Sequence, residues 1–273
     1  MQLEDHAGDI IRKACAMSHV SPAACAAAAE ISESDLTAFH KTGRCAQKVN
    51  FSAVAQITGL DAQKLATIAG GWLPVPADLS RWREIRVFTT AGEDLTVNCY
   101  LAWDAATRDA ALFDTGLAAQ PVLDTIAAEG LTLRHIFITH AHWDHVEALP
   151  PLRAAFPEAR LHGGSLKAPA DQRNQSGEII PLGALRIAHR ETPGHAEDGV
   201  TYLISDWPNG ASPVALVGDA VFAGSMGRGN QSWELARQKV REQILSLPAE
   251  TLLCPGHGPL TTVGEELAHN PFF

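Results

Sequence analysis

The sequence predicts an α+β protein in which a small all-α segment precedes a larger part built of sheets covered by helices. Apolar residues recur every three or four positions up to about residue 70, and the Gly- and Pro-rich stretch 70–76 then interrupts this pattern. From about residue 84 the apolar residues alternate with polar ones or form short runs, as in strands. We therefore expect a helical domain over 1–73 and a second domain over 74–273.

Helices are expected in the first segment at 8–18, 21–29, 33–40, 51–58 and 61–69. Ser or Asp stands where each helix would begin, and such side chains cap the free N–H groups of a first turn. The Ala-rich stretch 23–30 suits close packing between helices.

The second segment alternates strands with helices. Strands are expected at 84–90, 94–103, 110–116, 134–139, 159–164, 185–191, 201–205, 213–219 and 251–257. Helices are expected at 118–130, 146–156 and 232–247, with tandem prolines that should end or kink one turn of the second. Strands on both sides of helices imply a layered architecture.

Composition excludes several functional classes. The chain has 21 Lys and Arg against 31 Asp and Glu, and a net charge of −10 disfavours binding to nucleic acid. An apolar run long enough to cross a bilayer is absent from the sequence. The five cysteines form no C-x-x-C pair, and the opening MQLEDHAGDIIRK lacks the features of a secretory signal. We expect free thiols and a cytoplasmic protein.

The strongest motif is T-H-A-H-W-D-H-V-E, directly after the strand at 134–139. Residues two apart in an extended chain project to the same side, so His140 and His142 can bind one ion. Asp144 and His145 follow where the chain turns, and they can point toward a second ion. Burying so many ionisable groups without a metal would cost several kcal/mol.

Further ligand-type residues stand at the ends of later strands, each beside Gly or Pro: His195, Asp219 and His257. All seven side chains offer nitrogen or oxygen donors, which suit two divalent ions, first Zn and also Fe or Mn. Asp114, in F-D-T-G, is expected to shape a turn or orient a metal-binding loop. The remaining histidines of this part are expected to be structural: His135, His162, His189 and His269.

The order T-H-A-H-W-D-H, T-P-G-H, G-D-A and P-G-H-G resembles the metallo-β-lactamase superfamily. Within it, 84–273 is similar to the hydroxyacylglutathione hydrolase (glyoxalase II) branch. The ending of this chain, T-T-V-G-E-E-L-A-H-N-P-F-F, resembles the ending of the shorter enzymes of that branch. This resemblance implies an αββα sandwich with a binuclear site at one rim. It assigns His140, His142 and His195 to the first metal, Asp144, His145 and His257 to the second, and Asp219 to both.

The chemistry implied is hydrolysis of a small-molecule ester or thioester. Two cations lower the pKa of a shared water toward about 7, so that a bridging hydroxide can attack a thioester carbonyl while Asp144 accepts or relays a proton. A lactonase with the same site is the alternative. The chain departs from the family at Glu147 and Ala148, where Gly-Gly is usual, and has only the helix at 232–247 where longer glyoxalase II enzymes carry a glutathione-binding helical domain.

Residues 8–70 resemble λ-repressor-like helix-turn-helix domains in helix lengths and apolar positions. Residues 1–73 hold six basic and seven acidic residues, and the expected recognition helix opens with Glu33 and Asp35, which disfavour DNA. We therefore expect this segment to form a homodimer or to cap the active site. A regulator that senses a metabolite through the hydrolase part and binds DNA is the alternative from another class.

Overall fold

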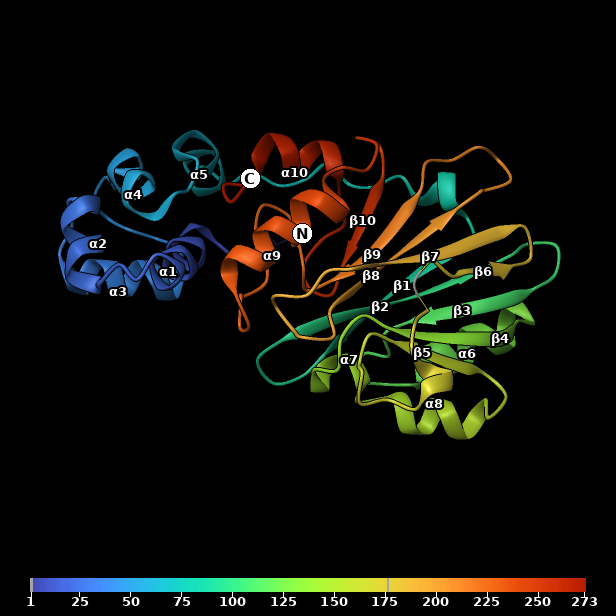
Figure 1. The fold of residues 1–273 in the computed structure, drawn as a ribbon. Coiled ribbons are helices and arrows are strands. Elements are labelled where there is room, and N and C mark those ends of the chain that lie inside the picture. Colours follow the sequence, from blue (N-terminus) through green and yellow to red (C-terminus); the bar gives the residue numbers. More distant parts are fainter. Residues whose placement is uncertain (1, 176) are drawn as a thin grey trace.

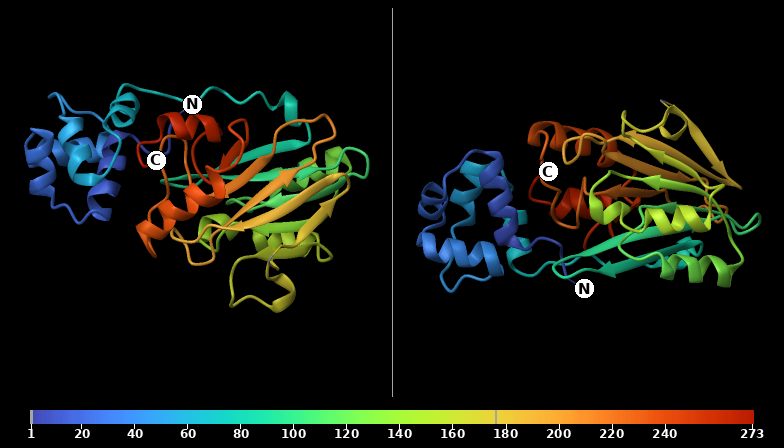
Figure 2. Two further views of the ribbon diagram at one scale, coloured as in Figure 1. Left: turned by 45° about the horizontal axis from the view of Figure 1, so that its top comes forward. Right: turned by 90° about the horizontal axis from the view of Figure 1, so that it is seen from below.

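The computed structural model describes residues 2–175 and 177–273 as a four-layer sandwich of two stacked sheets with helices on both outer faces (Figure 1). A group of helices from the N-terminal segment gathers at one end of the sheets, and both further views agree on this placement (Figure 2). The predicted α+β class and the αββα sandwich preceded by a helical segment are therefore confirmed.

Five helices form the N-terminal group: α1 (Ala7–Met17), α2 (Pro22–Ala29), α3 (Glu33–Thr42), α4 (Phe51–Thr58) and α5 (Ala62–Ala69). Side-chain caps begin α2, α3 and α5 as predicted, through Ser21, Ser32 and Asp61. The caps of α1 and α4 are instead His6 and Asn50, whose side chains also accept a hydrogen bond from the first turn.

The first sheet has the order β1-β2-β3-β4-β5. Its strands are β1 (Ile85–Ala91), β2 (Thr96–Trp103), β3 (Asp109–Phe113), β4 (Thr132–Ile138) and β5 (Arg160–Gly163), with α6 (Gln120–Glu129), α7 (Trp143–Val146) and α8 (Leu149–Ala155) in its connections. Strands β3, β4 and β5 run parallel, so each pair needs a helical crossover.

The second sheet has the order β11-β10-β9-β8-β7-β6. Its strands are β6 (Ile179–Leu182), β7 (Leu185–Glu191), β8 (Val200–Ser205), β9 (Val214–Gly218), β10 (Leu252–Pro255) and β11 (Thr261–Thr262). Short 3₁₀ turns lie at η1 (Leu79–Trp82) and η2 (Ala170–Gln172), and α9 (Trp233–Lys239), the π-helical turn η3 (Val240–Ile244) and α10 (Val263–His269) cover the outer face.

Alternation along β2 shows how the sequence divides the layers. Cys99 and Leu101 pack outward with the residues of α6, whereas Tyr100 and Ala102 pack inward between the two sheets. Successive side chains of a strand point to opposite faces, so a strand that is buried on both faces reads as one apolar run.

Two helices differ from their predicted ranges by more than two residues at one end. The helix expected at 146–156 begins only at Leu149, because Pro150 and Pro151 fit the first turn, where a missing N–H costs nothing. The helix expected at 232–247 is α-helical only to Lys239 and continues as the π-helical turn η3.

The N-terminal helices share a hydrophobic core with the end of the chain. Met226, Ala236 and Phe272 pack in the same buried cluster as the apolar residues of α1 to α5. The ammonium group of Lys64 donates to the carbonyls of Leu267 and Phe273, at 2.8 and 3.1 Å. The helical segment is thus packed onto the sandwich.

Among the described residues, every helix is too short or too polar to cross a membrane.

Candidate metal centre

The seven side chains predicted as metal ligands meet at one edge of the sandwich. Strand β4 precedes the T-H-A-H-W-D-H segment, while β7, β9 and β10 precede the other three residues. These strands run in one direction within their sheets, so the loops after their carboxyl ends gather at the same edge. The residues brought together are His140, His142, Asp144, His145, His195, Asp219 and His257.

The first cluster consists of three imidazole rings, from His140, His142 and His195. Nδ1 of His142 lies 2.9 Å from Nε2 of His140 and 3.0 Å from Nε2 of His195. A ring nitrogen carries either one hydrogen or one lone pair, so it cannot form good hydrogen bonds with both neighbours at once. Three converging nitrogens are the arrangement that a cation satisfies.

The second cluster combines Asp144, His145 and His257, all buried. Oδ2 of Asp144 lies 3.2 Å from Nε2 of His257 and 3.6 Å from Nε2 of His145. Two imidazoles and a carboxylate form a borderline donor set typical of zinc and iron sites.

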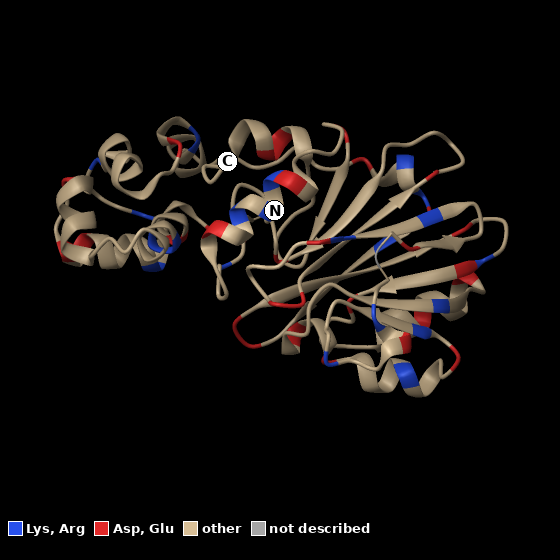
Figure 3. Ribbon diagram, in the orientation of Figure 1, with Lys and Arg blue, Asp and Glu red and all other residues tan. Residues whose placement is uncertain are grey.

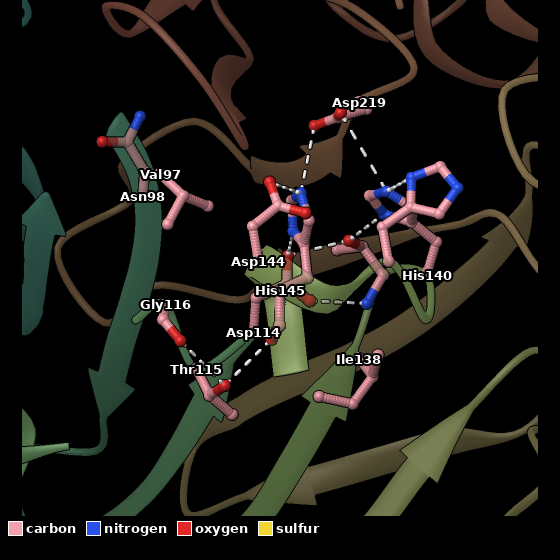
Figure 4. Close-up of polar contacts among 12 residues, drawn as sticks. Val97, Asn98, Asp114, Thr115, Gly116, Ile138, His140, Asp144, His145 and Asp219 are labelled. Carbon is pink, nitrogen blue, oxygen red and sulfur yellow. Dashed lines mark hydrogen bonds and ion pairs between the residues drawn. The ribbon is translucent and has the colours of Figure 1, made fainter. Parts of the chain in front are cut away.

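Asp219 lies between the two clusters, as Figure 4 shows for its contacts with His140 and His145. Its Oδ1 is 3.3 Å from Nε2 of His145, in the second cluster. Its Oδ2 is 3.4 Å from Nε2 of His195, in the first cluster. One carboxylate therefore faces both groups of ligands, in the position that the family resemblance gave to a bridging residue.

Hydrogen bonds to the outer ring nitrogens orient the ligands. Nδ1 of His195 donates to the carbonyl of Arg228 at 2.9 Å, and Nδ1 of His257 donates to the carbonyl of Thr96. A carbonyl only accepts, so Nδ1 carries the hydrogen in both rings, and Nε2 is the nitrogen that faces the ligand clusters. Such partners fix the tautomer and orientation of metal-binding histidines.

Unpaired atoms and one glycine indicate that a cation fits here. Nε2 of His145 and Oδ1 of Asp219 are buried and form no hydrogen bond with any described residue. A Cβ atom on Gly256 would overlap the Asp219 carboxylate and the His145 ring, so only glycine leaves the space between them. Buried groups of this kind normally have a partner, which a metal ion would supply.

The pKa shifts differ between the clusters. Burial, reinforced by His145, holds the pKa of His140 well below its ordinary value, and burial also lowers the pKa of His195. Burial opposes charge on His257 too, but Asp144 and Asp219 outweigh it and raise its pKa to about 11. The carboxylates thus stabilise positive charge at the second cluster, whereas burial disfavours positive charge at the first.

Asp114 supports the site from outside the ligand clusters. Its carboxylate accepts hydrogen bonds from N and Oγ1 of Thr139, at 2.7 and 2.8 Å, and its own backbone has φ 54°. Gly218 lies so close to Thr139 that a Cβ there would overlap its side chain. The turn after β3 is therefore tied to the end of β4 and to the start of the ligand segment.

Glu266 and Asn270, for which the sequence predicts no role, hold the loop that follows β9. Glu266 accepts hydrogen bonds from N of Gly224 and from Oγ1 of Thr261, and Nδ2 of Asn270 donates to the carbonyl of Ser225 at 2.7 Å. This loop leads to Arg228, whose carbonyl orients His195. The spacing E-x-x-x-N was the available signal, since it places both side chains near the end of α10.

The four histidines expected to be structural lie outside both clusters. His135 and His162 contact each other, with Nδ1 and Nε2 3.0 Å apart, and pack against Phe137. His189 lies on β7, and His269 packs against Trp72.

Comparison with known proteins agrees with this geometry. The family model described as the metallo-β-lactamase superfamily matches residues 92–170. A hydroxyacylglutathione hydrolase of Fuscovulum blasticum is 34% identical over 173 residues, which cover 60% of this chain and 65%, just under two thirds, of that protein. The probable metallo-hydrolase YqgX of Bacillus subtilis (strain 168) is 32% identical over 187 residues, covering 59% of this chain and 85% of that protein.

A solved structure shows the same fold. The crystal structure of TTHA1623 in a di-iron-bound form has a TM-score of 0.55 and 30% identity, and the match covers 68% of this chain and all of that chain. The chain therefore belongs to the metallo-β-lactamase superfamily, as a hydrolase-fold member similar to the hydroxyacylglutathione hydrolases.

Proposed function

We propose that the protein is a binuclear metal-dependent hydrolase that cleaves a small-molecule thioester. The observation that carries this proposal is the position of Asp219 between a three-histidine cluster and an Asp-His-His cluster. Similarity to a hydroxyacylglutathione hydrolase supports a thioester as the substrate class.

One ion would be held by His140, His142 and His195, a second by Asp144, His145 and His257, with Asp219 contacting both. When bound, such ions supply Lewis acidity that activates water and polarises a carbonyl group. We propose Zn as the native metal, while the same donors accept Fe or Mn, and the similar TTHA1623 structure is a di-iron form.

Asp144 is the proposed proton acceptor. Burial favours its neutral form, but the hydrogen bond with His257 outweighs burial and lowers the pKa of Asp144 below its ordinary value. A carboxylate that is ionised at neutral pH can bind metal and accept a hydrogen bond from a water molecule beside it, and we propose that Asp144 relays the proton of that water.

A lactone is the second candidate substrate, because its ester carbonyl makes the same demands on the site.

The DNA-binding alternative is not favoured: α3, the expected recognition helix, begins with acidic residues (Figure 3). A homodimer through the N-terminal helices stays a prediction. All five cysteines are free, and we propose the reducing cytoplasm as the location.

Metal-reconstituted protein assayed against S-acylglutathiones, other acyl thioesters and lactones tests the proposal. We expect thioester turnover that is lost with a chelator and restored by metal. Turnover of lactones alone would select the second candidate, and oxygen consumption in place of hydrolysis would contradict both.

A further inference from the structure

A cavity of about 370 Å³ lies between α1 and the loop that leads into α9. Its walls include Arg12 and Lys13 from α1, and Arg228, Asn230 and Trp233 from the other side. The N-terminal helices and the sandwich therefore build this cavity together, and neither part forms it alone.

The lining is cationic in a protein whose net charge is −10. Three of the lining side chains are basic, and none carries a carboxylate. Arg12 pairs with Asp9 at 2.7 Å, whereas the guanidinium of Arg228 has no carboxylate within 4.0 Å among the described residues. An exposed arginine without a partner, next to a second one, favours an anionic ligand.

Buried polar contacts fix α1 against this loop. Lys13 pairs with Asp5, and its ammonium group also donates to the carbonyl of Met226 at 2.9 Å. Oγ of Ser225 donates to the Asp5 carboxylate at 2.6 Å. Lys13 thus anchors the helix, which leaves Arg228, and the guanidinium N–H groups of Arg12 that its pair with Asp9 does not use, as the donors available to a ligand.

The loop that lines the cavity is hydrogen-bonded to the loop that carries His195, a ligand of the first cluster. The carbonyl of Arg228 accepts the hydrogen bond from Nδ1 of His195 at 2.9 Å, and N of Gln231 donates to the carbonyl of Gly194 at 2.9 Å. The loop that contains Arg228 and the loop that contains His195 are therefore held together by hydrogen bonds.

We propose that this cavity binds a carboxylate or phosphate group carried by the part of the substrate remote from the scissile carbonyl, with Arg12 of α1 as a specificity-determining residue. The proposal rests on the hydrolase function above and narrows its substrate to anionic thioesters. Arg228 supplies the second cation, and the indole of Trp233 supplies an aromatic wall for the chain that links the anion to the carbonyl. The helical segment then acts as part of the substrate site.

Steady-state kinetics of the metal-loaded full chain test this assignment. The probes are acetyl thioesters of one thiol, cysteamine, whose nitrogen carries a tail ending in a carboxylate (succinyl), a phosphonate (3-phosphonopropanoyl) or a neutral carboxamide (succinamoyl). We expect Arg12→Gln to raise KM about tenfold for an anionic tail with kcat within about twofold, because Arg12 does not touch the reacting atoms. The neutral tail should be unaffected, and the preferred anion identifies the group.

Arg44→Gln is the matched control, because Arg44 is an exposed arginine of the same segment that does not line the cavity. A second readout does not depend on hydrolysis. It measures the binding of N-ethylsuccinamate and N-ethyl-3-phosphonopropanamide, which keep the tail but lack the thioester. Binding is detected by calorimetry and by the change in the part of the tryptophan fluorescence that is absent in Trp233→Phe. Tail binding that weakens in Arg12→Gln without any thioester turnover would support the subsite and contradict the thioesterase. If the ratio of KM for an anionic tail to KM for the neutral tail is the same in Arg12→Gln, Arg44→Gln and the parent protein, the proposed subsite is wrong.

Discussion

Oδ2 of Asp114 lies 2.8 Å from Nδ1 of His145, so a carboxylate outside the ligand clusters holds a ring inside them. Burial opposes positive charge on His145, but the carboxylates of Asp114 and then Asp219 outweigh burial and raise the pKa of His145 to about 10. The contact points Nε2 of His145 toward Asp144 and Asp219, as Figure 4 shows.

Exchange of Asp114 for Asn should weaken metal binding at the second cluster. Loss of such an outer partner typically reduces metal affinity about 10- to 100-fold, because the ring loses its preferred tautomer and orientation. Zinc affinity measured by chelator competition checks this. Asp104→Asn is the control, since Asp104 is an equally buried carboxylate that accepts backbone hydrogen bonds far from the clusters. Equal zinc affinities in both variants would show that Asp114 does not orient His145 for metal binding.

Single-ligand variants should separate the two ions. We expect His142→Ala to lose the ion of the first cluster and His257→Ala that of the second, because each residue belongs to only one cluster. Asp219→Ala should reduce occupancy of both. Elemental analysis after gel filtration measures the metal content per folded chain. If His142→Ala and His257→Ala each lose both ions, the two clusters do not bind metal independently.

Gly256→Ala should impair the site by volume alone. The new methyl group would overlap the carboxylate of Asp219 and the ring of His145, so these side chains must separate. We expect metal content and turnover to fall at least about tenfold, the effect expected when ligand geometry is disturbed. Gly163→Ala is the control, because a Cβ at Gly163 meets no atom within 4 Å. Normal metal binding in Gly256→Ala would contradict the claim that only glycine fits between Asp219 and His145.

Glu266 should make stability depend on pH. Burial raises the pKa of its carboxyl to about 8, against an ordinary value of 4.5, although hydrogen bonds from Asn270 and Thr261 lower it. As pH rises from about 4.5 to 8, the unfolded chain releases this proton while the folded chain keeps it, so this contribution to stability falls and then levels off.

Glu266→Gln removes the titration. Its free energy of unfolding, measured relative to the parent protein by urea denaturation at constant metal concentration, should therefore rise across this pH range. Glu250→Gln, at an exposed position, is the control. A difference between Glu266→Gln and the parent that does not change with pH would show that Glu266 is ionised in the folded state.

Local signals explain how much of this fold could be predicted. The apolar run of β2 and the caps Ser21 and Ser32 are local features of the chain, so they can be read from the sequence. Strand β6 and helix α10 were not predicted, because each is short and gains its stability from neighbours in the folded protein.

The site divides in the same way. His140 and His142 could be assigned to one ion from their spacing alone, whereas the meeting of Asp219 with both clusters depends on β9 lying beside β10 and β8. The hydrogen bond from His145 to Asp114 joins residues 31 positions apart, and the cavity between Arg12 and Arg228 joins segments at opposite ends of the chain. Tertiary contacts of this kind leave no periodic trace in a single sequence.

In the function that we propose, Asp219 joins the two metal sites of a thioester hydrolase. Elemental analysis of the purified protein, coupled to thioester turnover on the same sample, tests it most directly. We expect two equivalents of metal per chain and a turnover rate that rises with occupancy of the second ion. One equivalent of iron with oxygen consumption and no thioester hydrolysis would contradict it.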